Sequence, residues 1–167
     1  MTKPRVAILM GSDSDLEIMN EGAEVFKDFG IAYEIKVLSA HRSPDDLLRF
    51  VKQAKAKGIE IFICGAGGAA HLAGAVAAHT TLPVIGVPIN STPLGGFDSL
   101  LATVQMPAGT PVATVSIGKP GARNAALLAC QMLALKETRL QKKLEEFKKK
   151  MAAGIRKKNE GLKKHLR

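Results

Sequence analysis

Tryptophan is absent from the 167-residue sequence, and aromatic residues make up only 4% of it. The hydrophobic fraction is nevertheless 46%, so a core must be built from Ala, Val, Ile and Leu. This composition excludes a disordered chain and is typical of a sheet that helices cover on both faces. The length fits one domain.

Cysteine is also scarce. Cys64 and Cys130 both lie in apolar runs, and no CxxC spacing exists, which argues against a metal knuckle. We expect two buried thiols and no bound metal. No apolar stretch of about 18 residues is free of Gly, Pro or charge, so we expect a soluble, cytoplasmic protein without a membrane partner.

Net charge is missing from most of the chain. Residues 136–167 hold 13 of the 24 basic residues and 4 of the 15 acidic ones, so the whole net charge of +9 belongs to this tail. A basic tail can bind nucleic acid, but a solvated helix explains it more simply, and stacking aromatics are few. We therefore do not expect a nucleic-acid partner.

Within the tail, Leu140, Leu144, Phe147 and Met151 recur at helical spacing. This apolar stripe predicts packing on its own domain or on a neighbouring subunit. We expect the chain to fray from about Gly154 onward. The domain prediction is thus residues 1–135 as an α/β domain and 136–167 as a basic helical extension.

The first 135 residues alternate between short apolar runs and helical runs. The predicted strands are 5–10, 33–38, 59–64, 84–87 and 112–117, and the predicted helices are 16–29, 44–56, 72–78, 99–104 and 122–135. Five such βα units require crossovers, which make the strands parallel. The predicted fold is a three-layer α/β sandwich around a five-stranded, doubly wound parallel sheet of the flavodoxin or Rossmann kind. Ligands of such sheets bind beyond the carboxyl ends of the strands.

Three loops at that edge could carry chemistry. The first, Gly11 to Asp15, combines a tight turn with Ser and Asp side chains before a helix, where phosphate is favoured, although ordinary capping would need the same residue types. The second holds His41 and Arg42: histidine can exchange a proton near neutral pH, and the planar arginine fork suits phosphate. The third, residues 65–71, has three glycines but lacks the GxGxxG dinucleotide pattern.

Two further loops, residues 88–96 and 118–121, follow the fourth and fifth strands; the former is long for its kind, as lids often are. No Gly-x-Ser-x-Gly nucleophile elbow is present. The three polar loops together supply a phosphate cradle, an Arg, a His and Gly-rich walls at one edge of one sheet.

Six stretches carry a resemblance to a known family. They are MGSDSD at 10–15, SAHRSPD at 39–45, GAGGAAHLAG at 65–74, PVIGVP at 83–88, DSLLATVQMPAGTPVATV at 98–115 and NAALLACQMLAL at 124–135. In order and spacing they resemble 5-(carboxyamino)imidazole ribonucleotide mutase, over roughly residues 5–135. This family moves a carboxyl group from an exocyclic nitrogen to ring carbon C4 in purine biosynthesis, without ATP, metal or organic cofactor.

The resemblance implies decarboxylation to CO2 and aminoimidazole ribonucleotide, followed by recarboxylation at C4. It implies that His41 is the general acid and base. The substrate contacts that it implies are Ser12, Ser14, Asp15, Ser39, Arg42, Gly67 and His71. Among these, Ser12, Ser14 and Arg42 would bind the 5′-phosphate, Asp15 the ribose, and the 65–71 loop would wall the CO2 pocket. A homo-octamer, with the C-terminal helix reaching neighbouring subunits, is implied as well.

The sequence departs from the family at three places. Leu16 stands where members carry Trp, Pro93 stands in the lid, and the basic tail is longer than expected. Two alternatives remain open: direct carboxylation of aminoimidazole ribonucleotide with CO2, and a non-catalytic binder of a phosphometabolite or nucleic acid.

Overall fold

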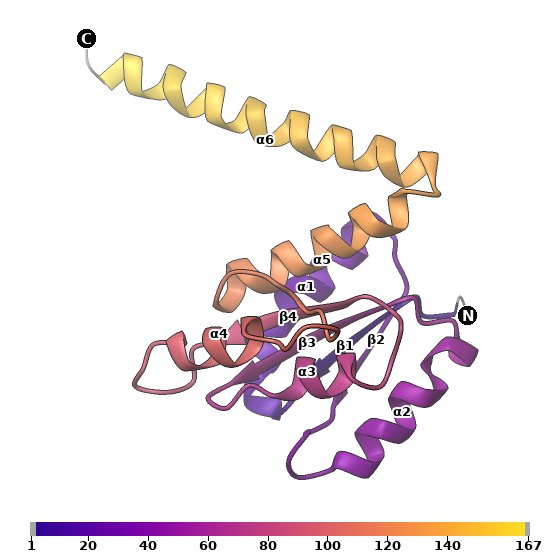
Figure 1. The fold of residues 1–167 in the computed structure, drawn as a ribbon. Coiled ribbons are helices and arrows are strands. Elements are labelled where there is room, and N and C mark those ends of the chain that lie inside the picture. Colours follow the sequence, from indigo (N-terminus) through magenta and orange to yellow (C-terminus); the bar gives the residue numbers. More distant parts are fainter. Residues whose placement is uncertain (1–2, 166–167) are drawn as a thin grey trace. The chain divides into compact units, whose positions relative to one another are not determined.

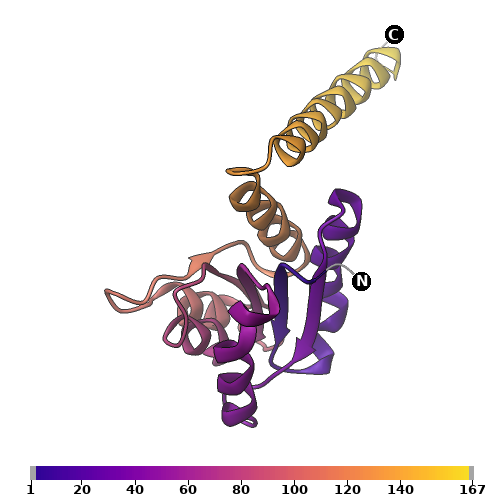
Figure 2. The ribbon, with the colours of Figure 1, turned by 90° about the vertical axis from the view of Figure 1, so that its right-hand side faces the viewer.

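The computed structural model describes residues 3–165, and the side chains of residues 3–162 (Figures 1 and 2). The chain forms two compact units, one reaching to Ala129 and one beginning at Cys130. The strands are β1 Val6–Met10, β2 Tyr33–Val37, β3 Ile61–Gly67, β4 Val84–Ile89 and β5 Ala113–Thr114. The helices are α1 Leu16–Phe29, α2 Pro44–Lys57, α3 Leu72–Ala77, α4 Phe97–Val104, α5 Gly118–Ala134 and α6 Thr138–His165, with a 3-10 turn, η1, at Asp13–Asp15.

All five strands lie in one parallel sheet, in the order β2-β1-β3-β4-β5. Val6 of β1 is paired with Tyr33 on one side and with Ile61 on the other. The predicted doubly wound α/β fold is therefore confirmed. The strand order reverses between β1 and β3, so the loops that follow these strands diverge and leave a crevice at the carboxyl edge.

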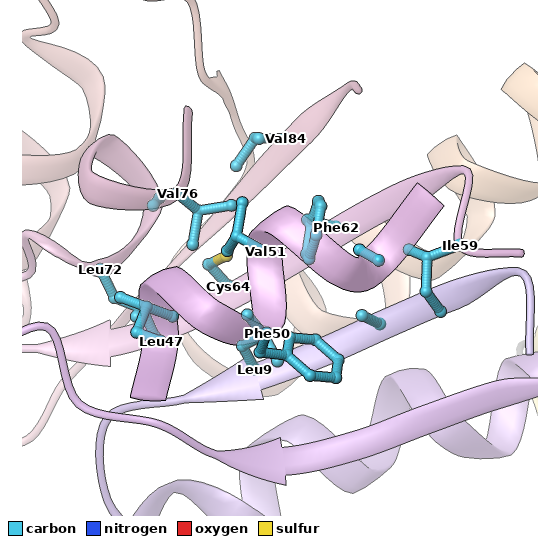
Figure 3. Packing of buried hydrophobic residues seen from close by; sticks show 13 residues of the cluster. Leu9, Leu47, Phe50, Val51, Ile59, Phe62, Cys64, Leu72, Val76 and Val84 are labelled. Carbon is cyan, nitrogen blue, oxygen red and sulfur yellow. The ribbon is translucent and has the colours of Figure 1, made fainter. Parts of the chain in front are cut away.

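The core follows from the period-2 alternation of buried strands. Leu9 of β1 and Phe62 of β3 point to the face that α2 and α3 cover, where thirteen buried residues form one cluster (Figure 3). Val6 and Ile8 are equally buried on the opposite side of the pleat. Glycine ends two of the covering helices: Gly30 after α1 and Gly58 after α2 adopt φ of 72° and 97°, which lets the backbone reverse toward the next strand.

Two predicted strands are longer in the structure and one is much shorter. β3 continues through Gly67, three residues beyond its predicted end, because Gly65, Ala66 and Gly67 pair with β4. Glycine is needed at position 65, where a Cβ would lie 2.3 Å from the Met19 sulfur. β4 likewise continues to Ile89. The predicted strand 112–117 is wrong in extent: only Ala113 and Thr114 pair with β4, at the edge of the sheet.

Two helical predictions also need correction. α5 begins at Gly118, so the predicted 118–121 loop forms its first turn. Pro120 is tolerated there because N–H groups in the first turn of a helix have no partner within the helix. The predicted fraying from Gly154 is wrong, because α6 is helical from Thr138 to His165. Its Lys, Ala, Glu and Leu residues favour helix enough to outweigh its two glycines, Gly154 and Gly161. Among the described residues, no helix is long and apolar enough to span a membrane.

Candidate active site

A cleft of about 310 Å³ opens at the carboxyl edge of the sheet, within the first unit. Loops after β1, β2, β3 and β4 contribute to it. Its lining residues are Gly11, Ser12, Ser14, Asp15, Ser39, Ala40, His41, Arg42, Ala66, Gly67, Ala69, His71, Leu72 and Ser91. All eight predicted site residues thus line one cavity, although their roles stay predictions.

The loop after β1 folds into η1 and does not lead straight into α1. Ser12 caps this turn: its Oγ accepts from the backbone N–H of Ser14 at 3.4 Å, and Asp13 Oδ1 accepts from the same N–H at 3.1 Å. Asp15 makes no side-chain cap for α1. Of the four polar residues at 12–15, Ser12 and Asp13 accept the capping hydrogen bond. The Ser14 and Asp15 side chains both line the cleft.

Asp15 is the buried carboxylate of the cleft, with 5% of its surface exposed. Burial raises the pKa of Asp15, while a hydrogen bond from the Ser12 backbone and the positive charge of Arg42 oppose that rise less strongly. The carboxylate is thus held in a place that penalises its charge. Such strain in an otherwise polar cleft is typical of a group kept for ligand binding.

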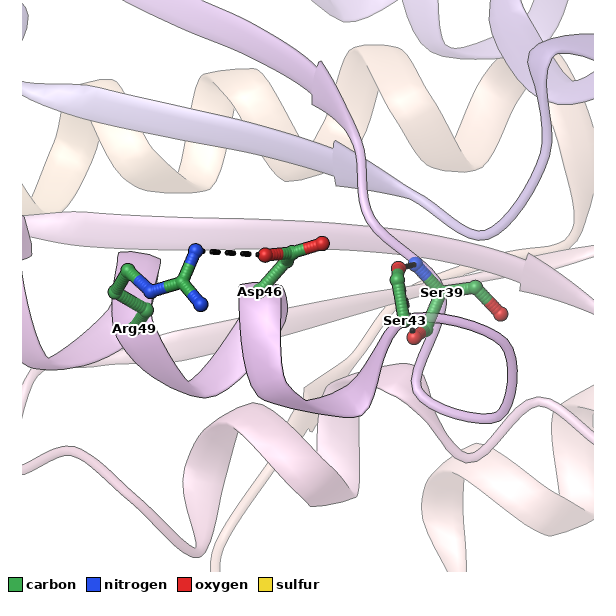
Figure 4. A network of polar contacts seen from close by, with 4 residues as sticks. All are labelled: Ser39, Ser43, Asp46 and Arg49. Atoms are coloured by element: carbon green, nitrogen blue, oxygen red, sulfur yellow. Dashed lines mark hydrogen bonds and ion pairs between the residues drawn. The ribbon is translucent and has the colours of Figure 1, made fainter.

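The loop after β2 is a closed hydrogen-bonded turn around Ser39. The Ser39 N–H donates to Ser43 Oγ at 3.0 Å, and the Ser43 N–H donates to the Ser39 carbonyl at 3.0 Å (Figure 4). Ser39 Oγ accepts from the backbone N–H groups of His41 at 3.3 Å and Arg42 at 3.1 Å. Ser39 therefore shapes the backbone that presents His41 and Arg42.

The Arg42 guanidinium joins the first two loops. Its Nη2 donates to the Gly11 carbonyl at 2.6 Å, and its Nε lies 3.5 Å from Ser39 Oγ. Arg42 also lines a smaller adjoining hollow of about 230 Å³, together with Ser12, Asp13 and Ser43 among others. A fixed positive charge thus stands where two hollows meet.

The loop after β3 brings a second histidine to the first. His41 Nε2 lies 2.9 Å from His71 Nδ1, and the two rings are nearly perpendicular at 87°. Both side chains are exposed at the mouth of the cleft. Within the described residues no three His, Cys, Asp or Glu side chains gather as a metal ion would require.

Ser91, from the loop after β4, was not among the predicted site residues. A Cβ on Gly67 would lie 1.8 Å from Ser91 Oγ, so glycine at this position lets the 90–96 loop approach β3. The available signal was the position of Ser91 just beyond a strand's carboxyl end. The length of this loop predicts a lid but does not identify Ser91 as a residue of the cleft.

Comparisons with known proteins agree with one another on the family and the fold of this chain. The family model described as AIR carboxylase matches residues 5–154. The "N5-carboxyaminoimidazole ribonucleotide mutase" of Saccharolobus solfataricus is 55% identical over 148 residues, which cover 89% of this chain and 92% of the relative. The mutase of the same name from Thermotoga maritima is 53% identical and covers 89% and 85%. The crystal structure of Treponema denticola PurE superposes with a TM-score of 0.86 at 29% identity, covering 95% of this chain and 98% of that one.

Proposed function

Because this chain belongs to the AIR carboxylase family, we propose that it is an N5-carboxyaminoimidazole ribonucleotide mutase of purine biosynthesis. The strongest support is a combination of sequence similarity and geometry. A chain more than half identical to named mutases places His41, Arg42 and Asp15 around one cleft at the switch point of the sheet. The cleft contains the two groups that such a substrate needs: an anchor for phosphate and a proton carrier.

Arg42 and the loop after β1 are the anchor. The smaller hollow is lined by Ser12, Ser39 and Arg42, which also line the larger one. A ribonucleotide has its phosphate and its base at opposite ends of the ribose. In our proposal the phosphate meets Arg42, Ser12 and Ser14, and the ribose hydroxyls donate to Asp15, which is buried between the loops.

His41 carries the proton. When the bond between the exocyclic nitrogen and the carboxyl carbon breaks, its electron pair returns to the nitrogen, which takes a proton as CO2 leaves. When C4 then attacks CO2, the new C4–carboxylate must lose its C4 proton. One imidazole that gives the first proton and accepts the second restores itself within a single turnover. The reaction is thus an isomerisation with no net proton change.

CO2 is small and uncharged, so the cleft must retain it between the two steps. The 90–96 loop is suited to close over it: Ser91 lines the cleft, Thr92 Oγ1 donates to Asp98 Oδ2 at 2.7 Å, and Gly95 and Gly96 both have positive φ. Leu94, 67% exposed, is an apolar side chain available to exclude water on closure. Gly67, at the end of the neighbouring strand β3, and His71, in the loop after it, form another wall of the cleft.

A spectroscopic assay tests the mutase. Purified protein is given the carboxyamino substrate in buffer stripped of CO2 and bicarbonate, without ATP or metal, and ultraviolet absorbance follows the carboxylated product. A mutase converts this substrate. The family name, AIR carboxylase, also favours a second candidate, direct carboxylation of aminoimidazole ribonucleotide. That activity would appear only with aminoimidazole ribonucleotide and added CO2, and its exclusive presence would overturn the mutase proposal.

We also propose a homo-octamer in the cytoplasm. On α6, Leu140 is 3% exposed, whereas Met151, Ile155 and Leu162 are 56–60% exposed along the same helix. Exposed apolar side chains at helical spacing favour cover by another copy of the chain. Sedimentation at micromolar concentration should give a mass near eight times 17.7 kDa. A monomer at that concentration would contradict the octamer.

A further inference from the structure

The contact between His41 and His71 joins residues that are thirty positions apart in the chain. His41 follows β2 and His71 precedes α3, on loops that flank the loop after β1 in the sheet order. The Nε2–Nδ1 distance of 2.9 Å is an ordinary hydrogen-bond length, and the perpendicular rings meet edge to edge, with centroids 5.0 Å apart. The rings therefore do not stack. They share a hydrogen.

This bond restricts the protons of the pair. Each ring nitrogen is either an N–H donor or a lone-pair acceptor, so one of the two facing nitrogens must carry a hydrogen and the other must not. Two imidazolium rings would turn two N–H groups toward one another and break the contact. The nitrogen of His41 that carries its proton is consequently set by the state of His71 Nδ1.

The surroundings leave this bond as the main restraint on the His41 ring. The Ser39 hydroxyl holds the backbone of His41, but the ring itself is exposed. His71 is better fixed, because a tight turn precedes it: the Ala70 N–H donates to the Gly68 carbonyl and the His71 N–H to the Ala69 carbonyl, both at 2.8 Å. The other charged side chains that line the cleft are Asp15 and Arg42, and Arg42 donates to the Gly11 carbonyl and to Ser39 Oγ.

We propose that His71 is a positioning residue: through Nδ1 it fixes the ring orientation and the tautomer of His41 in the free enzyme. The inference rests on the proposed function, in which His41 must first give and then take a proton at defined atoms. A ring that rotates freely, or divides its proton between two nitrogens, would present the wrong nitrogen to a fraction of the substrate molecules. His71 removes that fraction through its contact with His41, in addition to lining the cleft.

The tautomer can be measured without any substrate. Solid-state NMR of protein labelled with nitrogen-15 in histidine reports which ring nitrogens are protonated, and His41→Asn and His71→Asn assign the signals. We expect one defined tautomer for His41 and opposite protonation of His41 Nε2 and His71 Nδ1. In His71→Leu we expect the His41 signals to become those of a tautomer mixture. Unchanged His41 signals in His71→Leu, or equal protonation of the two facing nitrogens, would overturn the proposal.

Turnover provides the second readout, with three variants at one position. An Asn amide sits one bond beyond Cγ, as Nδ1 does, and can keep the hydrogen bond to His41. A Gln amide lies one bond farther out, and Leu has the bulk but no polar group. We expect kcat within about threefold of wild type for His71→Asn, and a loss of about tenfold to a hundredfold for His71→Gln and His71→Leu, with KM nearly unchanged.

These outcomes separate the positioning role from its alternatives. A loss that appears in KM, with kcat preserved, would make His71 a direct substrate ligand and overturn the inference. Equal losses in all three variants, the conservative Asn included, would do the same. If the wild-type protein converts neither substrate, the proposed function fails, whereas the NMR result on the free protein still decides whether His71 fixes the tautomer of His41.

Discussion

The cleft and helix α6 both hold basic side chains, but the two regions use them in opposite ways. In the cleft a single arginine, Arg42, is held by the Gly11 carbonyl and lies near Ser39 Oγ, beside a buried carboxylate. On α6, runs of basic residues at 148–150 and 156–158 are exposed to solvent. The net charge of the sequence comes from the tail that forms α6, whereas the candidate site lies in the part of the chain whose net charge is zero.

The difference shows what makes a charge specific. A charge whose direction is fixed by hydrogen bonds can meet a ligand without losing further side-chain freedom. Exposed charges on one helix are screened by salt and each contributes little. We therefore expect single substitutions in the cleft to have large effects, and changes in the basic end of α6 to have small ones.

His41→Asn should give the largest effect. The variant should fold and bind the ribonucleotide, but turnover should fall at least about a hundredfold, because the amide cannot give and then take a proton. Steady-state absorbance kinetics and calorimetric binding measure the two properties separately. His79→Asn is the matched control, since His79 is exposed and lies outside the cleft lining. Near wild-type turnover in His41→Asn, with turnover abolished in His71→Asn, would move the proton shuttle to the third loop.

Arg42→Ala should come next, by weakening substrate binding. The loss of a charge-assisted contact should cost roughly 2–4 kcal/mol of binding free energy, less at high salt. Calorimetry at two salt concentrations measures it. Arg49→Ala is the control: Arg49 pairs with Asp46 on the exposed side of α2, at 2.7 Å (Figure 4), so its loss should leave affinity unchanged. Equal affinity of wild type and Arg42→Ala would remove Arg42 from the phosphate site.

Two glycine substitutions sharpen the comparison at the level of packing. A Cβ on Gly121 would lie 1.6 Å from the Ser116 carbonyl oxygen, which is backbone and cannot turn aside, so Gly121→Ala should destabilise the fold by about 1–3 kcal/mol. Gly154 in α6 has nothing within 4 Å of such a Cβ, and Gly154→Ala should stabilise the helix by about 0.5–1 kcal/mol. Thermal unfolding followed by circular dichroism should therefore show opposite signs; the same sign in both would contradict the packing argument.

Asp15→Asn should raise stability at neutral pH. Because burial raises the pKa of Asp15 above its ordinary value, the folded state holds this proton more tightly than the unfolded chain does. Stability is therefore lost as pH rises from the ordinary carboxyl pKa through the raised pKa of the folded state, and the ionised carboxylate destabilises the fold at pH 7. Removing the charge should raise Tm by about 2–4 °C for each kcal/mol by which the free energy of unfolding rises.

The pH dependence distinguishes this effect from a general change in packing. The Tm difference between Asp15→Asn and wild type should shrink below the ordinary carboxyl value of 3.8, where Asp15 is protonated in both states. Asp13→Asn, at an exposed carboxylate two positions earlier, should show no comparable rise at pH 7. A lower Tm for Asp15→Asn at neutral pH would mean that the carboxylate stabilises the fold.

The sequence predicts the fold well because the spacing of its apolar residues and the positions of its Gly and Pro residues indicate the same elements. Gly30 and Gly58 mark the ends of α1 and α2, and Pro44 marks the start of α2. The errors fall where tertiary contacts decide. Glycines 65 and 67 belong to β3 because they pair with β4, and Met19 and Ser91 fill the space that side chains there would need. The apolar run at 112–117 pairs over only two residues. Neither fact is visible in a one-dimensional pattern.

The residues that line the cleft are also predictable from the sequence. The rule that ligands bind at the carboxyl ends of parallel strands, with the family resemblance, brings all eight predicted residues to one cavity. Distances between loops are not predictable, because they depend on strand order and on side-chain rotamers. The contact between His41 and His71 is of this kind, and so is the approach of Ser91 to Gly67.

Deleting residues 155–167 should give the smallest effect on turnover. The family match ends at residue 154, whereas α6 continues to His165, so the deletion removes only residues beyond that match. It holds six of the tail's 13 basic residues. The deletion also removes Ile155 and Leu162 of the exposed apolar stripe, but the cleft lies within the first unit. We therefore expect kcat and KM within about twofold of wild type, with weaker, salt-sensitive retention on a polyanion column. RNA binding at physiological salt by the full chain, lost in the deletion, would instead give the tail a nucleic-acid role, and a tenfold loss of turnover would tie these charges to catalysis. Unchanged turnover would show that the charge density of α6 and the chemistry of the cleft are separable properties of one chain.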